Sequence, residues 1–260
     1  MGGSVRYEIL GPLRVVDEEG NSFISARKIE VLLALLLIRA DQVVPTDQLI
    51  TEIWGEWAPR RANAGLHVNI SQLRKFLHRP GRPGSPIETR PPGYLLRLGS
   101  DDLDLHAFQK LASTGRTFFR QGHHAQAAAC FEQALGLWRG PVLADHRVGP
   151  LIEGFTTWLA EMRVECTEML VDTQLELGRH REVIGRLYSL TAEYPLREAF
   201  YRQLMLALYR SERQGDALKV YQSARKTLNE ELGLEPCRVL TRLQQAILTA
   251  DTQLDLCAAV

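Results

Sequence analysis

The order of apolar and polar positions divides this chain of 260 residues into two parts. In the first hundred residues, short alternating apolar segments stand on both sides of three helical patterns, whereas the remainder follows helical spacing almost throughout. Residues 5–16 predict two short strands separated by Gly11-Pro12, and residues 22–25 predict a third strand after a turn. We therefore expect a small antiparallel sheet near the N-terminus.

Three helices are predicted next. Residues 26–40 are apolar nearly all round, which is typical of a central helix buried on most faces. Thr46 is predicted to cap the second helix, which ends at Gly55. The segment Trp57-Ala58-Pro59 breaks the pattern, and residues 60–79 then predict the third helix.

The third helix has one apolar side and one mixed side. Its apolar stripe consists of Leu66, Ile70, Leu73 and Leu77. At about 100° per residue, the opposite side carries Arg61, Ala64, Val68, Ser71, Gln72, Lys75 and Arg79, with Asn63, His67 and Arg74 on one flank. A helix in a DNA major groove uses such a mixture, because cations meet phosphates while amide, hydroxyl and small apolar groups read base edges. The alternative is an ordinary solvated helix face.

The charge distribution favours the DNA interpretation. The whole chain is formally neutral, but residues 57–99 hold eight basic residues and one acid, Glu88, for a net charge of +7. The preceding residues carry −4 and the following ones −3. Concentrated positive charge of this kind is typical of a protein that binds a polyanion.

A hairpin is predicted after the third helix. Residues 80–86 (PGRPGSP) predict a loop, and residues 87–90 and 94–98 predict strands on either side of a tip at Pro91-Pro92-Gly93. The order sheet, three helices, hairpin is that of a winged helix-turn-helix with an N-terminal sheet.

From residue 101 onward, helical stretches are predicted at residues 105–121, 124–138, 154–176, 181–192, 197–209, 215–232 and 238–250. The segment that starts at Gly178 matches the one that starts at Glu212, an offset of 34 residues. That period is typical of tetratricopeptide repeats, in which helix pairs bury their apolar faces against their neighbours. We therefore expect a stacked helical array.

These blocks together resemble a known family. The first half contains YEILGPLRV, ARKIEVLLALLLIRADQVVPTDQLITEIWGE, NISQLRKFL and TRPPGYLLRL, and the second contains YPLREAFYRQLMLALYR and DALKVYQSARKTLNEELGLEPCRVLTRLQQAIL. The chain resembles the Streptomyces antibiotic regulatory protein family, in which an OmpR-type winged helix precedes a bacterial transcriptional activator domain. The resemblance implies a mainly α fold with a small β component. The implied domains are residues 1–99, the winged helix-turn-helix, and 100–250, the tetratricopeptide-like array, before a flexible tail at 251–260.

The resemblance also implies a function. A member of this family is expected to bind direct repeats near the −35 promoter element as two protomers side by side, and to recruit RNA polymerase through its sigma factor. The implied target is a cluster of genes for secondary-metabolite biosynthesis. Response regulators of the OmpR type carry a phosphoacceptor receiver domain that is missing here, so no phosphorylation switch is inferred. We expect a cytoplasmic protein at the bacterial nucleoid, with no cofactor and no metal.

The candidate DNA-binding residues lie on the third helix and the hairpin. They are Arg60, Arg61, His67, Val68, Ser71, Gln72, Arg74, Lys75, Arg79, Arg90, Tyr94 and Arg97. Which of them read bases and which contact phosphates stays open. For Tyr94, packing in the core is favoured over stacking on DNA. Glu56 and Trp57 are candidates for the polymerase contact, although Trp57 packing against Trp54 is an equal alternative.

Other functional classes find less support. The sequence lacks G-x-x-x-x-G-K-[ST], H-E-x-x-H and G-x-S-x-G, so no enzyme is indicated. Its four cysteines form no C-x-x-C pair and no zinc-ligand spacing with histidine. The acids Asp101, Asp102 and Asp104 are interpreted as charges that complement a helix dipole. The main rival to the activator is a protein–protein adaptor in which the winged helix is only a scaffold.

Overall fold

The structure is a computed structural model that describes residues 4–18, 20–79, 84–143, 149–251 and 254. The chain forms two compact units. The first unit comprises Met1–Leu111 and Gln133–Arg163, and the second comprises Ala112–Glu132 and Val164–Val260. In the described residues, no helix is both long and apolar enough to cross a membrane.

The predicted N-terminal sheet is present and gains a fourth strand. Its strands are β1 (Arg6–Glu8), β2 (Arg14–Asp17), β3 (Gly20–Ser22) and β7 (Asp102–Leu103). Their order is β3-β2-β1-β7, with β1, β2 and β3 antiparallel and β7 parallel to β1. The third strand was predicted two to three residues too late. The fourth was not predicted, because two residues are too few to show alternation.

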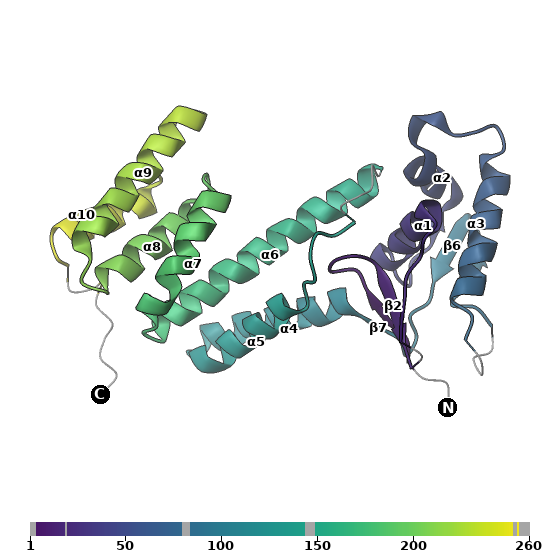
Figure 1. Cartoon of the computed structure of the whole chain (residues 1–260), viewed down its shortest axis with the longest axis horizontal. Coiled ribbons are helices and arrows are strands. Elements are labelled where there is room, and N and C mark those ends of the chain that lie inside the picture. The colour runs from purple at the N-terminus through teal and green to yellow at the C-terminus, as the bar shows by residue number, and fades with distance from the viewer. Residues whose placement is uncertain (1–3, 19, 80–83, 144–148, 252–253, 255–260) are drawn as a thin grey trace. The chain divides into compact units, whose positions relative to one another are not determined.

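The three helices of the winged helix-turn-helix are also present (Figure 1). They are α1 (Arg27–Ile38), α2 (Thr46–Trp54) and α3 (Ala62–Phe76), with a 3₁₀ turn, η1 (Gly55–Trp57), after α2. Residues 31–37 of α1 are all buried, which confirms α1 as the central helix. Thr46 does not cap α2: the N-cap is Pro45, and the Thr46 hydroxyl donates a hydrogen bond to the Pro92 carbonyl at 3.0 Å.

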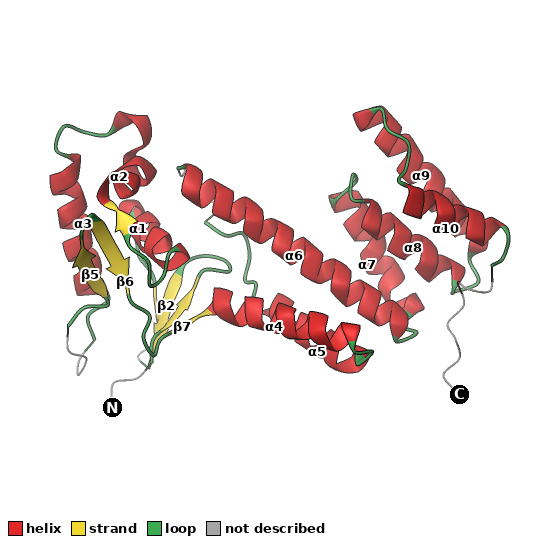
Figure 2. Ribbon diagram, turned by 180° about the vertical axis from the view of Figure 1, so that it is seen from behind, coloured by secondary structure: helices red, strands yellow, loops and turns green. Residues whose placement is uncertain are grey.

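The hairpin forms the wing, here the strands β5 (Ile87–Arg90) and β6 (Gly93–Leu96) (Figure 2). A short strand, β4 (Val44–Pro45), pairs with β6 and completes a sheet in the order β4-β6-β5. Gly93 has to be glycine here, because a Cβ atom would lie 1.9 Å from the Val44 carbonyl oxygen. Residues 80–83 of the predicted loop lie outside the described part of the chain.

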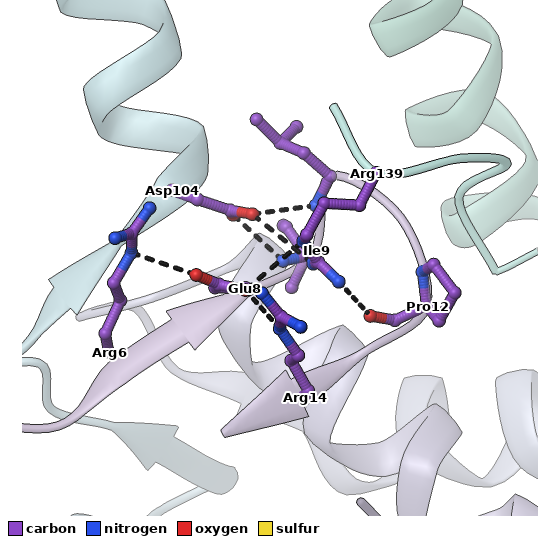
Figure 3. A network of polar contacts seen from close by, with 8 residues as sticks. Arg6, Glu8, Ile9, Pro12, Arg14, Asp104 and Arg139 are labelled. Atoms are coloured by element: carbon purple, nitrogen blue, oxygen red, sulfur yellow. Dashed lines mark hydrogen bonds and ion pairs between the residues drawn. The ribbon is translucent and has the colours of Figure 1, made fainter. Parts of the chain in front are cut away.

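A buried polar network joins the N-terminal sheet to the start of α4 (Asp104–Arg120) and to Arg139 (Figure 3). The Asp104 carboxylate accepts hydrogen bonds from the backbone N–H groups of Ile9 at 2.9 Å and Leu10 at 3.0 Å. The Arg139 guanidinium lies 3.7 Å from the same carboxylate and donates to the Pro12 carbonyl at 3.0 Å. Asp104 therefore does more than complement a helix dipole, because it holds a loop that is 94 residues away.

Glu8 lies at the centre of the same network. Its buried carboxylate pairs with Arg14, with Arg6 at 3.2 Å and with Arg139 at 3.2 Å. Burial raises the pKa of the Asp104 carboxyl, although the two backbone hydrogen bonds and Arg139 act in the opposite direction. Two carboxylates and three guanidinium groups thus fix the N-terminal sheet.

A second long-range contact joins α2 to α6 (Pro150–Glu176). The carboxylate of Glu52, which is buried, accepts hydrogen bonds from the N–H groups of Leu151 at 2.8 Å and Ile152 at 3.4 Å. These N–H groups are in the first turn of a helix and have no partner within it, so a carboxylate is well placed there. Gly149 leaves the necessary space, because a Cβ atom would lie 2.7 Å from the Glu52 carboxylate.

The second half of the chain is helical, as predicted. Besides α4 and α6, the helices are α5 (His124–Gly136), α7 (His180–Glu193), α8 (Glu198–Tyr209), α9 (Gln214–Leu232) and α10 (Arg238–Leu248). The helices α4, α5 and α6 contribute to both units. Most of their ends lie within two residues of the prediction, but α6 begins four residues earlier. One apolar core in the second unit takes side chains from the C-terminal part of α6 and from α7 to α10.

The repeat is visible in the backbone as well. Gly178 and Glu212, 34 residues apart, both have positive φ, 77° and 63°. The next residue in each case donates an N–H to a carbonyl five residues back, Arg179 to Gln174 and Arg213 to Leu208. This is a Schellman helix end, and a new helix starts directly after it. The two helix ends that are 34 residues apart therefore share one backbone conformation.

Candidate DNA-binding surface

The apolar stripe of α3 is buried as predicted. Leu66, Ile70 and Leu73 are fully or nearly fully buried, and Leu77 follows just after the helix. This stripe fixes the rotation of α3 and leaves the mixed side outward.

The mixed side is exposed along its length. Val68, Ser71, Gln72 and Lys75 are exposed, at the spacing i, i+3, i+4 and i+7, which places them on one face. Val68 is notable, since an apolar side chain is 56% exposed at the centre of this face. The face offers an apolar contact, a hydroxyl, an amide and an ammonium group, which together can read base edges and hold phosphate.

Arg74 has an intramolecular role in this structure. Its guanidinium donates to the Ile87 carbonyl at 3.1 and 3.2 Å and to the Thr89 hydroxyl at 2.9 Å. It also lies 6.0 Å from the centre of the Tyr94 ring. Arg74 therefore connects α3 to the wing.

His67 and Tyr94 make a second such connection. The Tyr94 side chain is only 3% exposed, so packing in the core is confirmed for its ring. Its hydroxyl lies 2.8 Å from Nδ1 of His67, which is on the exposed flank of α3. The two side chains hold the wing at a fixed distance from α3.

Arg79 is directed toward the N-terminal sheet. Its guanidinium lies 2.6 Å from the Asp17 carboxylate and donates to the carbonyls of Phe76 and His78. Its side chain is 19% exposed. Arg60 and Arg61, which precede α3, are both exposed. The two ends of the predicted basic helix thus differ: the N-terminal arginines face solvent, whereas Arg79 stabilises the fold.

The wing arginines, Arg90 and Arg97, are both exposed, and both pair with Glu88. In the sequence Glu88 stands out only as the one acid of the basic segment, and no role was predicted for it. The period of a strand would have placed it on the same face as Arg90, because the two residues are two apart.

The candidate polymerase contact follows α2. Trp57 is 89% exposed, so its ring is not packed against Trp54. Trp54 instead lies beneath the Lys28 ammonium group, 5.1 Å from the centre of its ring. The side chain of Glu56 lies outside what the structure describes. Within the described residues, no cluster of three or more His, Cys, Asp or Glu side chains could hold a metal ion.

Comparison with known proteins identifies the family. The model for "Transcriptional regulatory protein, C terminal" matches residues 24–96, and that for "Bacterial transcriptional activator domain" matches residues 103–248. The regulatory protein DnrI of Streptomyces peucetius is 37% identical over 258 residues, which cover 96% of this chain and 94% of DnrI. The chain belongs to the Streptomyces antibiotic regulatory protein family. It is therefore a transcriptional regulator with a winged helix and a helical activator domain.

Other members differ in length. The transcriptional regulator RedD of Streptomyces coelicolor is 35% identical, and the match covers all of this chain and 75% of RedD. The regulatory protein AfsR of Streptomyces griseus is 38% identical, but only 25% of its length is covered. The solved structure of Mycobacterium tuberculosis EmbR in complex with a low-affinity phosphopeptide superimposes with a TM-score of 0.90 at 35% identity, over 95% of this chain and 66% of EmbR.

Proposed function

We propose that the chain is a sequence-specific DNA-binding activator that inserts α3 into the major groove and lays the wing along the backbone. Two protomers would bind side by side on direct repeats near the −35 element and recruit RNA polymerase through its sigma factor. Membership of the Streptomyces antibiotic regulatory protein family supports a secondary-metabolite cluster as the target. The protein would act at the nucleoid, in the cytoplasm.

The observation that supports this proposal is the exposed face of α3. Its residues Val68, Ser71, Gln72 and Lys75 supply the groups that direct readout requires, on a helix whose opposite side is fixed in the core. Arg74 and His67 fasten the wing to the same helix, so both elements are presented as one rigid surface. A surface that is organised before binding loses little conformational entropy when DNA binds.

DNA binding is tested by substitution on this surface. Arg61→Ala and Lys75→Ala should each weaken binding to a direct-repeat promoter about three- to tenfold and reduce the slope of log K against log salt by roughly one. Thermal unfolding should be unchanged, because both side chains are exposed. Binding would be measured by fluorescence anisotropy at several salt concentrations, on the promoter and on random duplex DNA.

The matched control is Arg242→Ala, which removes an exposed cation from α10 in the second unit. It should leave binding unchanged. Promoter binding as tight in Arg61→Ala and in Lys75→Ala as in the wild type would refute the assignment of α3 as the recognition helix. Wild-type binding without any preference for the repeats would favour the adaptor.

The polymerase contact requires a different test. Trp57→Ala should leave the promoter affinity unchanged but reduce transcription in a reconstituted assay with polymerase holoenzyme. The reason is that a large exposed aromatic side chain is typical of the centre of an interface. Equal loss of DNA binding and transcription would show instead that Trp57 supports α3.

A further inference from the structure

The face of the wing that points away from α3 carries an unusual group of charges. In the β5–β6 register, Glu88 pairs with Leu95 and Arg90 pairs with Gly93. Because side chains alternate along a strand, Glu88 shares one face with Arg90 and with Arg97, two residues beyond Leu95. Thr89 is on the other face, where it accepts the hydrogen bond from Arg74.

The Glu88 carboxylate bridges the two guanidinium groups. Arg90 donates to Oε2 from Nε at 2.9 Å, and its Nη2 lies 2.8 Å from the same oxygen. Arg97 donates to Oε1 from Nε at 2.9 Å, with Nη2 at 3.5 Å from Oε2. Hydrogen bonds from Arg97 and then Arg90 lower the pKa of Glu88 to about 2, so the carboxylate is charged at neutral pH.

This arrangement imitates a DNA phosphate. A phosphate presents anionic oxygens to guanidinium groups in the same way as a carboxylate, through charge-assisted hydrogen bonds. DNA that approaches the wing therefore competes with Glu88 for the Nε and Nη2 donors of Arg90 and Arg97. Afterwards the released carboxylate lies close to the phosphates and repels them.

This competition weakens non-specific DNA binding more than it weakens specific DNA binding. Non-specific binding depends almost wholly on phosphate contacts, so it loses a large share of its free energy. Specific binding adds base contacts from α3, where Val68, Ser71 and Gln72 are independent of Glu88.

We propose that Glu88 is a specificity-determining residue, a built-in competitor that suppresses binding of the wing to non-cognate DNA. The inference rests on the proposed function, since it requires that the wing meets DNA. The proposal predicts that removal of the Glu88 charge strengthens binding to DNA, which is the opposite of what a positioning role predicts. If Glu88 served only to orient Arg90, its removal would weaken binding.

The experiment compares Glu88→Gln with the wild type on a direct-repeat promoter and on random duplex DNA, across a salt series. Glutamine keeps the size of the side chain but removes its charge. Random DNA should bind about three- to tenfold tighter, with a slope in log salt that is steeper by roughly one or two, since up to two guanidinium groups become available. The promoter should gain less, so the ratio of the two affinities should fall.

Two controls show whether tighter binding of Glu88→Gln comes from the release of Arg90 and Arg97 or only from the more positive net charge of the protein. Glu231→Gln makes the same charge change at an exposed position of α9 and should leave both affinities unchanged. In an Arg90→Gln/Arg97→Gln background, Glu88→Gln should lose its effect on random DNA. An undiminished effect in that background would overturn the proposal, because the arginines would then not be its route.

Other outcomes are equally decisive. Weaker binding of Glu88→Gln to both DNAs would overturn the proposal in favour of a positioning role, and unchanged binding would overturn it in favour of a solvated ion pair. Glu88→Asp keeps the charge on a shorter side chain and should lie between glutamine and the wild type. A wild type with no preference for the promoter would refute the proposed function, a result visible before any Glu88 variant is measured.

Discussion

The two compact units are stabilised in different ways. The first unit depends on buried polar contacts between residues far apart in the chain, such as Asp104 with Ile9 and Glu52 with Leu151. The core of the second unit is formed by apolar side chains from neighbouring helices, and its turns repeat a local backbone motif. A repeat array can thus be built from local signals, whereas the winged-helix unit needs individual carboxylates at individual positions. Substitutions should therefore have larger effects on stability in the first unit than in the second.

The largest effect is expected for Asp104→Ala. It leaves the N–H groups of Ile9 and Leu10 without their acceptor and removes one partner of Arg139. The free energy of unfolding should fall by about 3 kcal/mol, since each buried unpaired donor costs roughly 1–3 kcal/mol. Denaturant titration of the full chain would measure this loss.

The neighbouring Asp102→Ala is the control for that experiment. Asp102 is exposed in β7, so its loss should cost about 0.5 kcal/mol or less. Similar losses in the two variants would mean that the buried network contributes little, and the contrast between the units would then disappear.

A smaller effect is expected for Glu52→Gln. Glutamine keeps one carbonyl acceptor for the start of α6 but removes the negative charge that favours the positive end of the helix. The loss should be about 1–2 kcal/mol, because the site is buried. Glu153→Gln, an exposed acid in the first turn of the same helix, should cost only a few tenths of that amount. An equal loss in both variants would show that burial of Glu52 is unimportant.

In the second unit, substitutions at the two equivalent turns should change the free energy of unfolding in opposite directions. Gly178→Ala forces a Cβ atom into a left-handed conformation and should cost about 1 kcal/mol, whereas Glu212→Gly relieves the same strain and should stabilise by up to about 1 kcal/mol. Both would be measured by thermal unfolding. Shifts of the same sign would show that the two turns are not equivalent.

The smallest effect on stability concerns Glu88. Its lowered pKa means that its ion pairs stabilise the folded state fully above about pH 4.5 and cease to do so as the pH falls toward about 2. The pairs are near the surface, so the change in unfolding free energy should be small. Carboxyl titration followed by NMR should give a pKa of about 2, rising in Arg97→Gln. A normal pKa in the wild type would mean that the bridge does not form in solution.

Most helices and strands whose apolar residues recur at regular spacing were predicted from the sequence. The buried stripe of α3, the hairpin and the helices of the array were found because their apolar residues recur at 3.6 or at 2. The roles of Arg74, Arg79 and Glu88 were not found, since each depends on a partner brought near only by the fold. A count of charges treats Arg79 and Lys75 alike, yet the first binds Asp17 and the second faces solvent.

The short strand β7 also has a consequence for how such proteins can be recombined. A break at residue 99 would strip β1 of its parallel neighbour and remove the acceptors at Asp101 and Asp104, which leaves an open sheet edge of the kind that promotes aggregation. Fragments that end there, and chimaeras joined there, should aggregate, whatever DNA-binding residues they carry. A fragment that ends within α4 would still lack Arg139, which pairs with Asp104, and the start of α6, which pairs with Glu52. The unit of exchange between family members is thus larger than the DNA-binding motif that it carries.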